Sequence, residues 1–230
     1  MFQYIKYFFY LSFNWNISIA WHIIKQEIKG EKKYGIDTTG ADELKTLEKK
    51  GIDITHATIY MPASYDLLEE LFEQVNIAIH QQPDPAQANH QGGHFLDIGC
   101  GKGRALTVAT HYGFLKLTGI DLSKELCNGA AKNLAVTKQK NPRIDYSIIN
   151  NDAFYFAIPA DADCIFLFNP FDELIMSAVV QNICNSLHDH PRSLYIMYVN
   201  PLHKELFIKA GFKEIYHTKK MKYLEAVILA

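Results

Sequence analysis

The residues best suited to chemistry lie in the stretch FLDIGCGKGRAL, residues 95–106. An acid, Asp97, precedes three glycines at alternating positions, Gly99, Gly101 and Gly103. Glycine has no Cβ, so such a loop can turn tightly and bring its backbone close to a ligand. A strand-to-helix turn that binds nothing would need one glycine rather than three. The stretch therefore predicts a loop that binds a small molecule.

A second acid suits the same site. In the segment GIDLS, Asp121 stands 24 residues after Asp97 (121 − 97), at the end of the next predicted strand. A carboxylate there can accept hydrogen bonds from both hydroxyls of a ribose, and Asp97 can hold a cationic amino group. The ribose interpretation fits NAD as well. However, Arg104 stands where the dinucleotide fingerprint G-x-G-x-x-G has its third glycine. We expect Lys102 and Arg104 to be solvated or paired locally rather than to contact a substrate.

These acids and glycines must be positioned by a sheet, and the chain after residue 94 has the pattern of one. We expect strands at about 94–98, 116–121, 143–149, 163–168 and 192–199. We expect helices at about 103–112, 123–139, 172–188 and 202–210. The alternation predicts a parallel sheet with helices on both faces, which binds ligands at the carboxyl ends of its strands. The last two apolar runs, FKEIYHT and KYLEAVILA, predict an antiparallel hairpin.

The first part of the chain has a helical pattern instead. The segment SYDLLEELFEQVNIAIH (64–80) carries an apolar stripe of helical period, and Ser64 is placed to cap it. ADELKTLEKK predicts a further helix before Gly51. The polar, proline-containing stretch at 81–93 is the clearest linker. We therefore predict a helical extension or cap at residues 1–93 and an α/β domain at 94–230.

The N-terminal 24 residues are rich in aromatic side chains and carry one charged residue, Lys6. A transmembrane helix needs about 20 predominantly apolar residues, and this run is interrupted by Ser12, Asn14, Asn16, Ser18 and His22. The asparagines also argue against a signal peptide. We expect a helix docked on the main domain of a cytoplasmic protein. The alternative is peripheral contact of residues 1–24 with a membrane surface.

The composition is that of an ordinary globular protein of 230 residues, with 48% hydrophobic and 21% charged side chains. A net charge of −2 gives no electrostatic basis for binding nucleic acid through a broad basic face. The four cysteines are widely spaced and lack a CxxC pair, which favours free thiols. His188 and His190 have no third ligand at suitable spacing, so we expect no metal site.

Together, these motifs resemble those of the class I S-adenosylmethionine-dependent methyltransferases over about residues 94–230. DIGCGKG is similar to the first motif of that family, GIDLS to the second and NNDAFYF to the third. IFLFNPFDE stands where the fourth motif follows the fourth strand. The resemblance implies a seven-stranded, mostly parallel Rossmann-like sheet with an antiparallel last strand and helices on both faces. It also implies S-adenosyl-L-methionine as cofactor.

The resemblance assigns roles to individual residues. Asp152 would contact the adenine amino group and Phe154 would flank the ring, although Asp152 could instead cap a short turn. Asp121 would bind the ribose, although it could instead cap the next helix, for which Ser123 is better placed. The residues expected to bind the cofactor are Asp97, Gly99, Cys100, Gly101, Gly103, Asp121, Leu122, Asp152, Ala153 and Phe154.

The segment FNPFDE is expected on the acceptor side. It resembles, incompletely, the Asn/Asp-Pro-Pro-Tyr/Phe motif of methyltransferases that act on planar or amide-like nitrogen, because Phe171 replaces the second proline. We expect Asn169, Pro170 and Phe171 to be catalytic, with Asn169 orienting the acceptor. The alternative is an Asx-turn from Asn169 that leads into a helix capped by Asp172.

Further candidates flank this site. Tyr198 and Asn200, in YVNP, end the fifth predicted strand. The segment ATIYMPAS loosely resembles the pre-fold segment of lysine methyltransferases of the histone and ATP-synthase-subunit type, which covers the cofactor. Tyr60 and Tyr65 would then be lid residues, or alternatively aromatic anchors of the 64–80 helix.

The sequence thus predicts a methyltransferase that acts on an unidentified acceptor, either a protein side chain such as lysine or a small molecule. The rival interpretation is a non-catalytic module of the same fold that docks a partner or a membrane through its N-terminal helix. The intact glycine loop and its two acids favour the enzyme, because a scaffold has no need of them.

Overall fold

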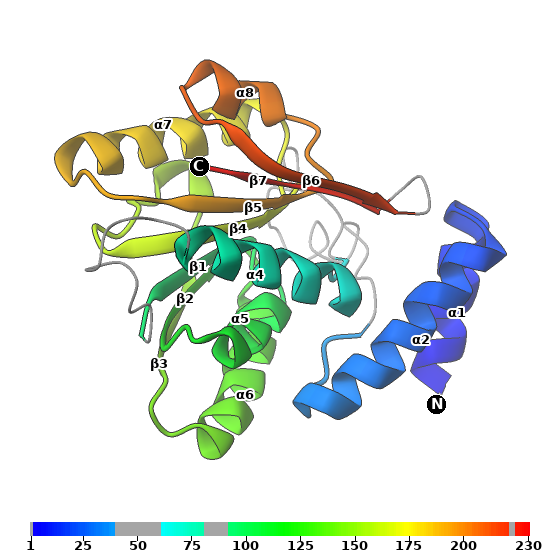
Figure 1. Cartoon of the computed structure of the whole chain (residues 1–230). Helices are drawn as coiled ribbons and strands as arrows, with labels where there is room; N and C mark the ends of the chain where they lie inside the picture. The colour runs from blue at the N-terminus through cyan, green and yellow to red at the C-terminus, as the bar shows by residue number, and fades with distance from the viewer. Residues whose placement is uncertain (1, 40–60, 81–91, 221–223) are drawn as a thin grey trace.

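A seven-stranded sheet forms the centre of the molecule (Figure 1). The computed structural model describes residues 2–39, 61–80, 92–220 and 224–230. The strands are β1 (His94–Ile98), β2 (Lys116–Asp121), β3 (Asp145–Asn150), β4 (Ala162–Phe168), β5 (Tyr195–Val199), β6 (Glu214–Lys220) and β7 (Leu224–Leu229). Their order is β3-β2-β1-β4-β5-β7-β6. The first five strands are parallel, and β7 runs antiparallel to both β5 and β6. The expected fold class is confirmed.

Helices cover both faces of this sheet. On one face lie α4 (Tyr65–His80), α5 (Arg104–Ala109) and α6 (Lys124–Lys140), and on the other lie α7 (Glu173–Asp189) and α8 (Lys204–Lys209). Successive strand residues alternate between the two cores: Phe95 joins the α4–α6 side, and Leu96 joins the α7–α8 side. This is the period-2 alternation that a sheet covered on both faces requires.

The observed elements lie within a few residues of the expected ones. The helix predicted at 103–112 is divided, because α5 ends at Ala109 and a 3₁₀ turn, η1 (Thr110–Tyr112), follows before Gly113. Gly113 has a φ of 96°, a left-handed conformation that ends a helix. A second 3₁₀ turn, η2 (Ala153–Tyr155), follows β3. The helix predicted in ADELKTLEKK and most of the predicted linker lie outside the described residues.

The start of α4 differs from its predicted cap. The backbone carbonyl of Ser64 accepts a hydrogen bond from the N–H of Leu68. Its hydroxyl, however, is buried and has no hydrogen-bond partner among the described residues, so it does not cap the helix. The four cysteines do carry free thiols, as expected.

The N-terminal helices form a hairpin beside the sheet (Figure 1). α1 (Phe2–Asn14) packs against α2 (Ile17–Tyr34) around a small apolar cluster that includes Leu11, Ile19 and Ile23. Asn16 caps α2 by accepting a hydrogen bond from the N–H of Ile19 (2.9 Å). Of the helices that the structure describes, none is long and apolar enough to cross a bilayer.

Candidate functional site

A cavity of about 240 Å³ opens at the carboxyl ends of β1, β2 and β4. This is the edge at which parallel α/β sheets bind their ligands. Nine of the predicted site residues line it: Asp97, Gly99, Cys100, Asp121, Leu122, Asp152, Ala153, Pro170 and Phe171. The first, second, third and fourth motifs of the sequence therefore meet around one space.

The glycine loop approaches the segment after β4 at close range. Gly99 has a φ of 83°, in the left-handed region that favours glycine. A Cβ at Gly99 would lie only 2.7 Å from Cβ of Pro170, so a larger residue here would push the cavity wall apart. Gly101 and Gly103 also have positive φ but lie outside the lining residues of the cavity. Their role in the described structure is to turn the chain into α5.

Asp97 is the buried acid of the cavity. Its residue is 2% exposed, and its Oδ1 atom has no hydrogen-bond partner among the described residues. Burial, followed by the nearby charge of Asp121, raises the pKa of Asp97 well above the usual aspartate value. Buried polar atoms in proteins nearly always have a partner, and an unpaired buried carboxylate is costly. The geometry is therefore suited to a cationic group of a ligand.

Asp121 joins the first loop to the second. Its Oδ2 accepts a hydrogen bond from the N–H of Gly101 (2.9 Å), and its Oδ1 accepts one from the N–H of Ser123 (2.8 Å). Burial raises the pKa of Asp121, while these two hydrogen bonds oppose the increase. Ser123 caps α6, as the alternative interpretation of Asp121 allowed. Each carboxylate oxygen has further lone-pair capacity for ligand hydroxyls.

The third motif supplies a turn as well as part of the wall. Oδ1 of Asp152 accepts a hydrogen bond from the N–H of Phe154 (2.9 Å) and so caps η2. Asp152 and Ala153 line the cavity. Phe154 lies outside its wall, packed against the α7–α8 core with its ring edge-on to Tyr155. The turn-capping role of Asp152 is observed, and the contact of both residues with a cofactor stays a prediction.

Asn169 and Tyr198 form a buried polar pair behind the cavity. The hydroxyl of Tyr198 donates a hydrogen bond to Oδ1 of Asn169 (3.0 Å), and burial raises the pKa of Tyr198 to about 12. Asn169 adopts a φ of 35°, which is strained for a residue with a side chain. Asp172 caps α7 through the N–H of Ile175 (3.1 Å). Neither member of the pair lines the cavity, although Pro170, next in the chain, does.

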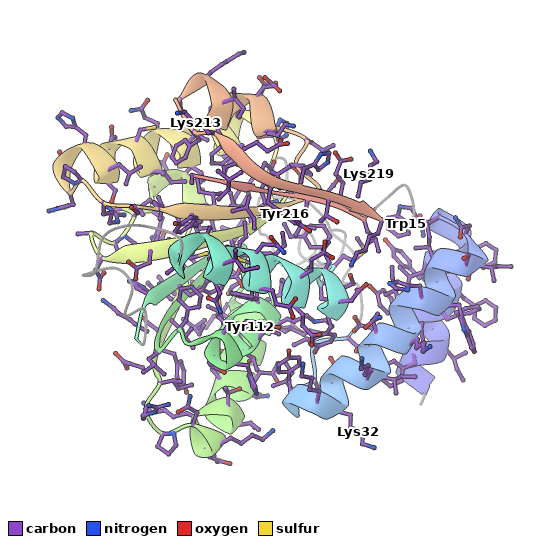
Figure 2. All side chains as sticks on the ribbon, in the orientation of Figure 1. Trp15, Lys32, Tyr112, Lys213, Tyr216 and Lys219 are labelled. Carbon is purple, nitrogen blue, oxygen red and sulfur yellow. The ribbon has the colours of Figure 1, made fainter. Side chains whose placement is uncertain are left out.

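A second cavity, of about 200 Å³, adjoins the first, and Met61 and Phe168 line both. The inner face of the N-terminal hairpin forms one side of it, and the ends of β5 and β7 form the other. Its remaining lining residues are Trp15, Ile19, Ile23, Val199, Asn200, Leu224 and Glu225. Figure 2 shows Trp15 at the turn of the hairpin, near the end of β6. The walls are mostly apolar.

Asn200, predicted from the sequence, is thus in the second cavity rather than the first. It has a φ of 49°, and its N–H donates a hydrogen bond to the carbonyl of Glu225 (2.8 Å). The hairpin side of this cavity was missed by sequence reasoning. Trp15 and Ile19 lie far from the strand ends in the chain, and no spacing rule connects them.

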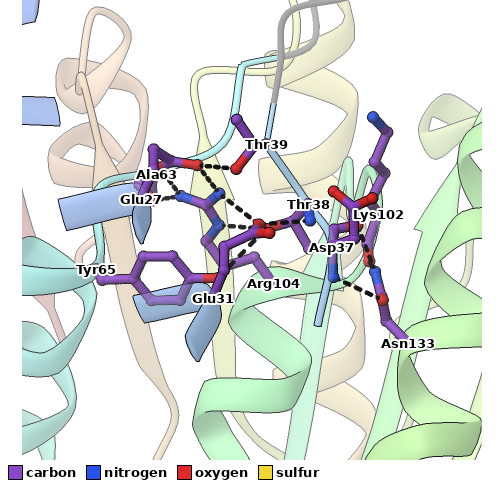
Figure 3. A network of polar contacts seen from close by, with 10 residues as sticks. All are labelled: Glu27, Glu31, Asp37, Thr38, Thr39, Ala63, Tyr65, Lys102, Arg104 and Asn133. Atoms are coloured by element: carbon purple, nitrogen blue, oxygen red, sulfur yellow. Dashed lines mark hydrogen bonds and ion pairs between the residues drawn. The ribbon is translucent and has the colours of Figure 1, made fainter. Parts of the chain in front are cut away.

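A network centred on Arg104 connects the glycine loop to the N-terminal hairpin (Figure 3). The guanidinium group binds Glu27 through two hydrogen bonds, Nη1 to Oε1 (2.5 Å) and Nη2 to Oε2 (2.6 Å). Nε donates to Oγ1 of Thr38 (2.8 Å), and Nη1 also donates to the carbonyl of Ala63 (2.8 Å). Tyr65 lies under the cation, with its ring centre 4.2 Å away. A bidentate pair of an arginine and a carboxylate is among the strongest hydrogen-bonding arrangements in proteins.

This network corrects one expectation and informs another. Arg104 was expected to be solvated or paired locally, but it is buried and its main partner, Glu27, is 77 residues away. Tyr65 is buried, stacks on Tyr34 at 5.4 Å and lines neither cavity, as an anchor of α4 would. Tyr60 lies outside the described residues. A signal for the network did exist, since Glu27 falls within the apolar stripe of α2.

Comparisons with known proteins show what part of the chain resembles. Residues 95–190 match a family described as a methyltransferase domain. A search of the curated proteins gave no match. Among solved structures, the PH0226 protein of Pyrococcus horikoshii is 16% identical, with a TM-score of 0.51 over 79% of this chain and 97% of that one. A putative methyltransferase of Escherichia coli is 15% identical, with a TM-score of 0.51 over 74% and 88%.

A third solved structure was determined with bound S-adenosylmethionine. It is magnesium protoporphyrin IX methyltransferase of Synechocystis PCC 6803, which is 14% identical, with a TM-score of 0.50 over 71% of this chain and 78% of that one. At such low identities, these structures show a shared fold. Together with the family match, they confirm the resemblance to the class I methyltransferases.

Proposed function

We propose that this chain, which has the class I methyltransferase fold and whose residues 95–190 match a methyltransferase domain family, transfers a methyl group from S-adenosylmethionine to an amino nitrogen. One observation carries the cofactor part of the proposal, and the partial Asn-Pro motif at 169–170 supports the amino acceptor. Oδ1 of Asp97 is buried in the cavity wall without a hydrogen-bond partner among the described residues. The α-ammonium group of the cofactor is a cationic hydrogen-bond donor, and it could donate to this oxygen.

The surrounding residues fit the rest of the cofactor. Gly99 leaves room for its amino-acid portion, because a Cβ there would already meet Pro170. Asp121 and Asp152, both in the wall, would accept hydrogen bonds from the ribose hydroxyls and the adenine amino group. When bound, the cofactor supplies an electrophilic methyl group on a sulfonium.

The acceptor would occupy the second cavity, which shares Met61 and Phe168 with the first. Its apolar walls exclude water and favour an acceptor with an apolar or aromatic body, which can pack against Trp15. Methyl transfer needs the nucleophile close and in line, so positioning supplies most of the rate enhancement. Tyr198 holds Asn169, which lies in the chain between Phe168 and Pro170 of the cavity walls. Asn169 would orient the acceptor by fixing this segment rather than by touching the acceptor nitrogen.

The source of that nitrogen sets what else the site must do. A neutral amine of a small molecule needs positioning alone, whereas a protonated lysine must first lose a proton in a desolvated pocket. Lysate incubated with radiolabelled cofactor, then separated into protein and small-molecule fractions, distinguishes the two. Label in neither fraction would contradict the proposed activity.

Calorimetric titration with S-adenosylmethionine tests the cofactor directly. We expect binding by the wild-type chain and strongly weakened binding by Asp97→Asn. No heat of binding at millimolar cofactor would favour the non-catalytic module instead. A non-catalytic module would not account for the buried carboxyl of Asp97, whose Oδ1 has no hydrogen-bond partner among the described residues. The enzyme is therefore the better supported function.

A further inference from the structure

The N-terminal hairpin carries an exposed apolar surface on the side away from the sheet. Phe13 is 86% exposed, Ile17 70% and Trp21 68%. The whole surface, which we term the hairpin apolar face, consists of Ile5, Phe9, Phe13, Ile17, Trp21 and Ile28. In each helix these residues recur at intervals of four or seven, so they lie on one side of it. Trp21 also contacts Phe8 of α1 edge-on, which connects the two helices.

The charges of the hairpin are divided between its two sides. Its exposed ionisable residues, among those described between 4 and 34, are all cationic: Lys6, Lys25, Lys29, Lys32 and Lys33. Its two acids face inward, where Glu27 binds Arg104 and Glu31 accepts hydrogen bonds from Thr38. Lys33 pairs with Glu69 of α4 (2.8 Å) and so faces the α/β domain. The exposed side therefore combines apolar groups with the remaining lysines and lacks acids within this range.

The two kinds of residue follow one another along α2. Ile17 and Trp21 lie near the turn of the hairpin, and Lys25, Lys29 and Lys32 continue at intervals of three to four residues. Figure 2 shows Trp15 near the turn and Lys32 toward the other end of the helix. Exposed aromatic residues beside a row of lysines are typical of helices that lie in the interface of an anionic bilayer.

We propose that the hairpin apolar face binds the surface of a membrane that contains anionic lipids. The helices would lie on the bilayer rather than cross it, because neither is long and apolar enough to span it. The inner side of α2 stays bound to the α/β domain through Glu27 and Arg104. The apolar side chains would enter the headgroup region while the lysines contact lipid phosphates. This inference does not depend on the proposed enzymatic activity.

Vesicle sedimentation of the full chain tests the proposal. We expect binding to phosphatidylcholine vesicles that contain about 30% phosphatidylserine, and at least about tenfold weaker binding to pure phosphatidylcholine. The variant Phe13→Ser/Trp21→Ser should abolish binding, and Lys25→Glu/Lys32→Glu should weaken it by at least about tenfold. These positions are exposed, so circular dichroism should match wild type. Thermal unfolding should change only by the loss of the contact between Trp21 and Phe8.

Two exposed leucines on the α/β domain, Leu174 and Leu202, provide the matched control. The variant Leu174→Ser/Leu202→Ser removes as many exposed apolar side chains and should bind vesicles like wild type. Equal loss of binding in this control would overturn the proposal, because it would indicate non-specific hydrophobicity. So would wild-type protein that stays in solution with anionic vesicles.

Tryptophan fluorescence gives an independent readout, because the chain has only two tryptophans. In Trp15→Phe, the emission of Trp21 should shift to the blue with anionic vesicles and be quenched by brominated lipid. Unchanged emission would place Trp21 outside the bilayer. A dimer seen by sedimentation velocity and dissolved by Phe13→Ser/Trp21→Ser, without vesicle binding by wild type, would assign the face to a second copy of the chain instead.

Discussion

Arg104 and Asp97 are both buried charged residues in the wall of the same cavity, and they have opposite surroundings. The guanidinium of Arg104 has a carboxylate, a hydroxyl, a carbonyl and an aromatic face as partners. The carboxyl of Asp97 has an oxygen with no partner among the described residues, and its nearest charge, Asp121, is of the same sign. The chain itself supplies every partner that Arg104 needs, whereas the described residues leave one oxygen of Asp97 without a partner.

The contrast separates structure from function. A buried charge with every partner in place stabilises one arrangement of the chain and needs nothing more. A buried charge left without partners lowers stability, so its presence indicates a ligand that supplies them. Each of the following changes tests one side of this comparison.

The largest effect is expected at the complete site. Glu27→Ala would leave the guanidinium of Arg104 buried with only Glu31, 3.7 Å away, as a carboxylate neighbour. Removing one partner of a buried ion pair costs about 3–5 kcal/mol, so the free energy of unfolding should fall by that amount. Urea denaturation followed by circular dichroism measures it. A loss below about 1 kcal/mol would mean that the network behaves like a surface ion pair.

At the incomplete site, Asp97→Asn should separate binding from stability. We expect cofactor affinity to fall by about 1.5–3 kcal/mol, the range of hydrogen bonds to charged groups. The variant without ligand should be at least as stable as wild type at neutral pH, because an amide avoids the cost of a buried carboxyl whose pKa is raised. Calorimetry and thermal unfolding on the same samples give both quantities. If stability falls along with affinity, Asp97 is a structural residue.

Asp121 lies between these extremes, since both of its oxygens accept backbone hydrogen bonds. Asp121→Ala should weaken cofactor binding by about 1–3 kcal/mol and also destabilise the glycine loop. Hydrogen exchange at the amide of Gly101 measures the second effect in the absence of ligand. Normal affinity would show that the ribose is bound elsewhere.

A pH series sharpens the comparison further. The raised pKa of Asp97 means that the folded, unliganded protein holds this proton above about pH 3.9, where the unfolded chain releases it. The free energy of unfolding should therefore fall as pH rises through this window. Cofactor affinity should rise over the same range, by at most about tenfold per pH unit, because binding releases the proton. Asp97→Asn should reduce both slopes by the contribution of this one proton, while Asp121 and Glu31, whose pKa values are also raised, keep theirs.

The smallest effect belongs to an exposed ion pair that serves as a reference. Nζ of Lys204 lies 2.7 Å from Oε2 of Glu214 in a partly exposed position. Lys204→Ala should change the free energy of unfolding by less than about 1 kcal/mol in the same urea experiment. A loss as large as that of Glu27→Ala would show that burial does not distinguish the two pairs.

Local sequence patterns predicted most of the sheet and the cavity. The glycine loop, Asp121 and Pro170 come together because parallel strands share one carboxyl edge, which is a general property of the fold. Arg104 was misjudged because its partner, Glu27, lies on a helix that packs against the loop only in the tertiary structure. The burial of two acids on the inner side of α2 depends on that same packing.

The acceptor side was less predictable for a related reason. Pro170 and Phe171 line the cavity, but Asn169 turns its oxygen toward Tyr198, from the neighbouring strand. The second cavity needs Trp15 from the hairpin and Glu225 from β7, at opposite ends of the chain. No periodicity or motif spacing joins residues that are more than 200 positions apart (225 − 15).

The ion pair between Glu27 and Arg104 has a practical consequence for anyone who trims this protein. A version shortened to start at residue 61 would retain the segment that matches the family model. It would lack Glu27, so Arg104, at the start of α5, would lose its carboxylate partner. Such a fragment would be expected to aggregate or to lose the shape of the glycine loop. Inactivity in that fragment would then say nothing about the activity proposed for the 230-residue chain.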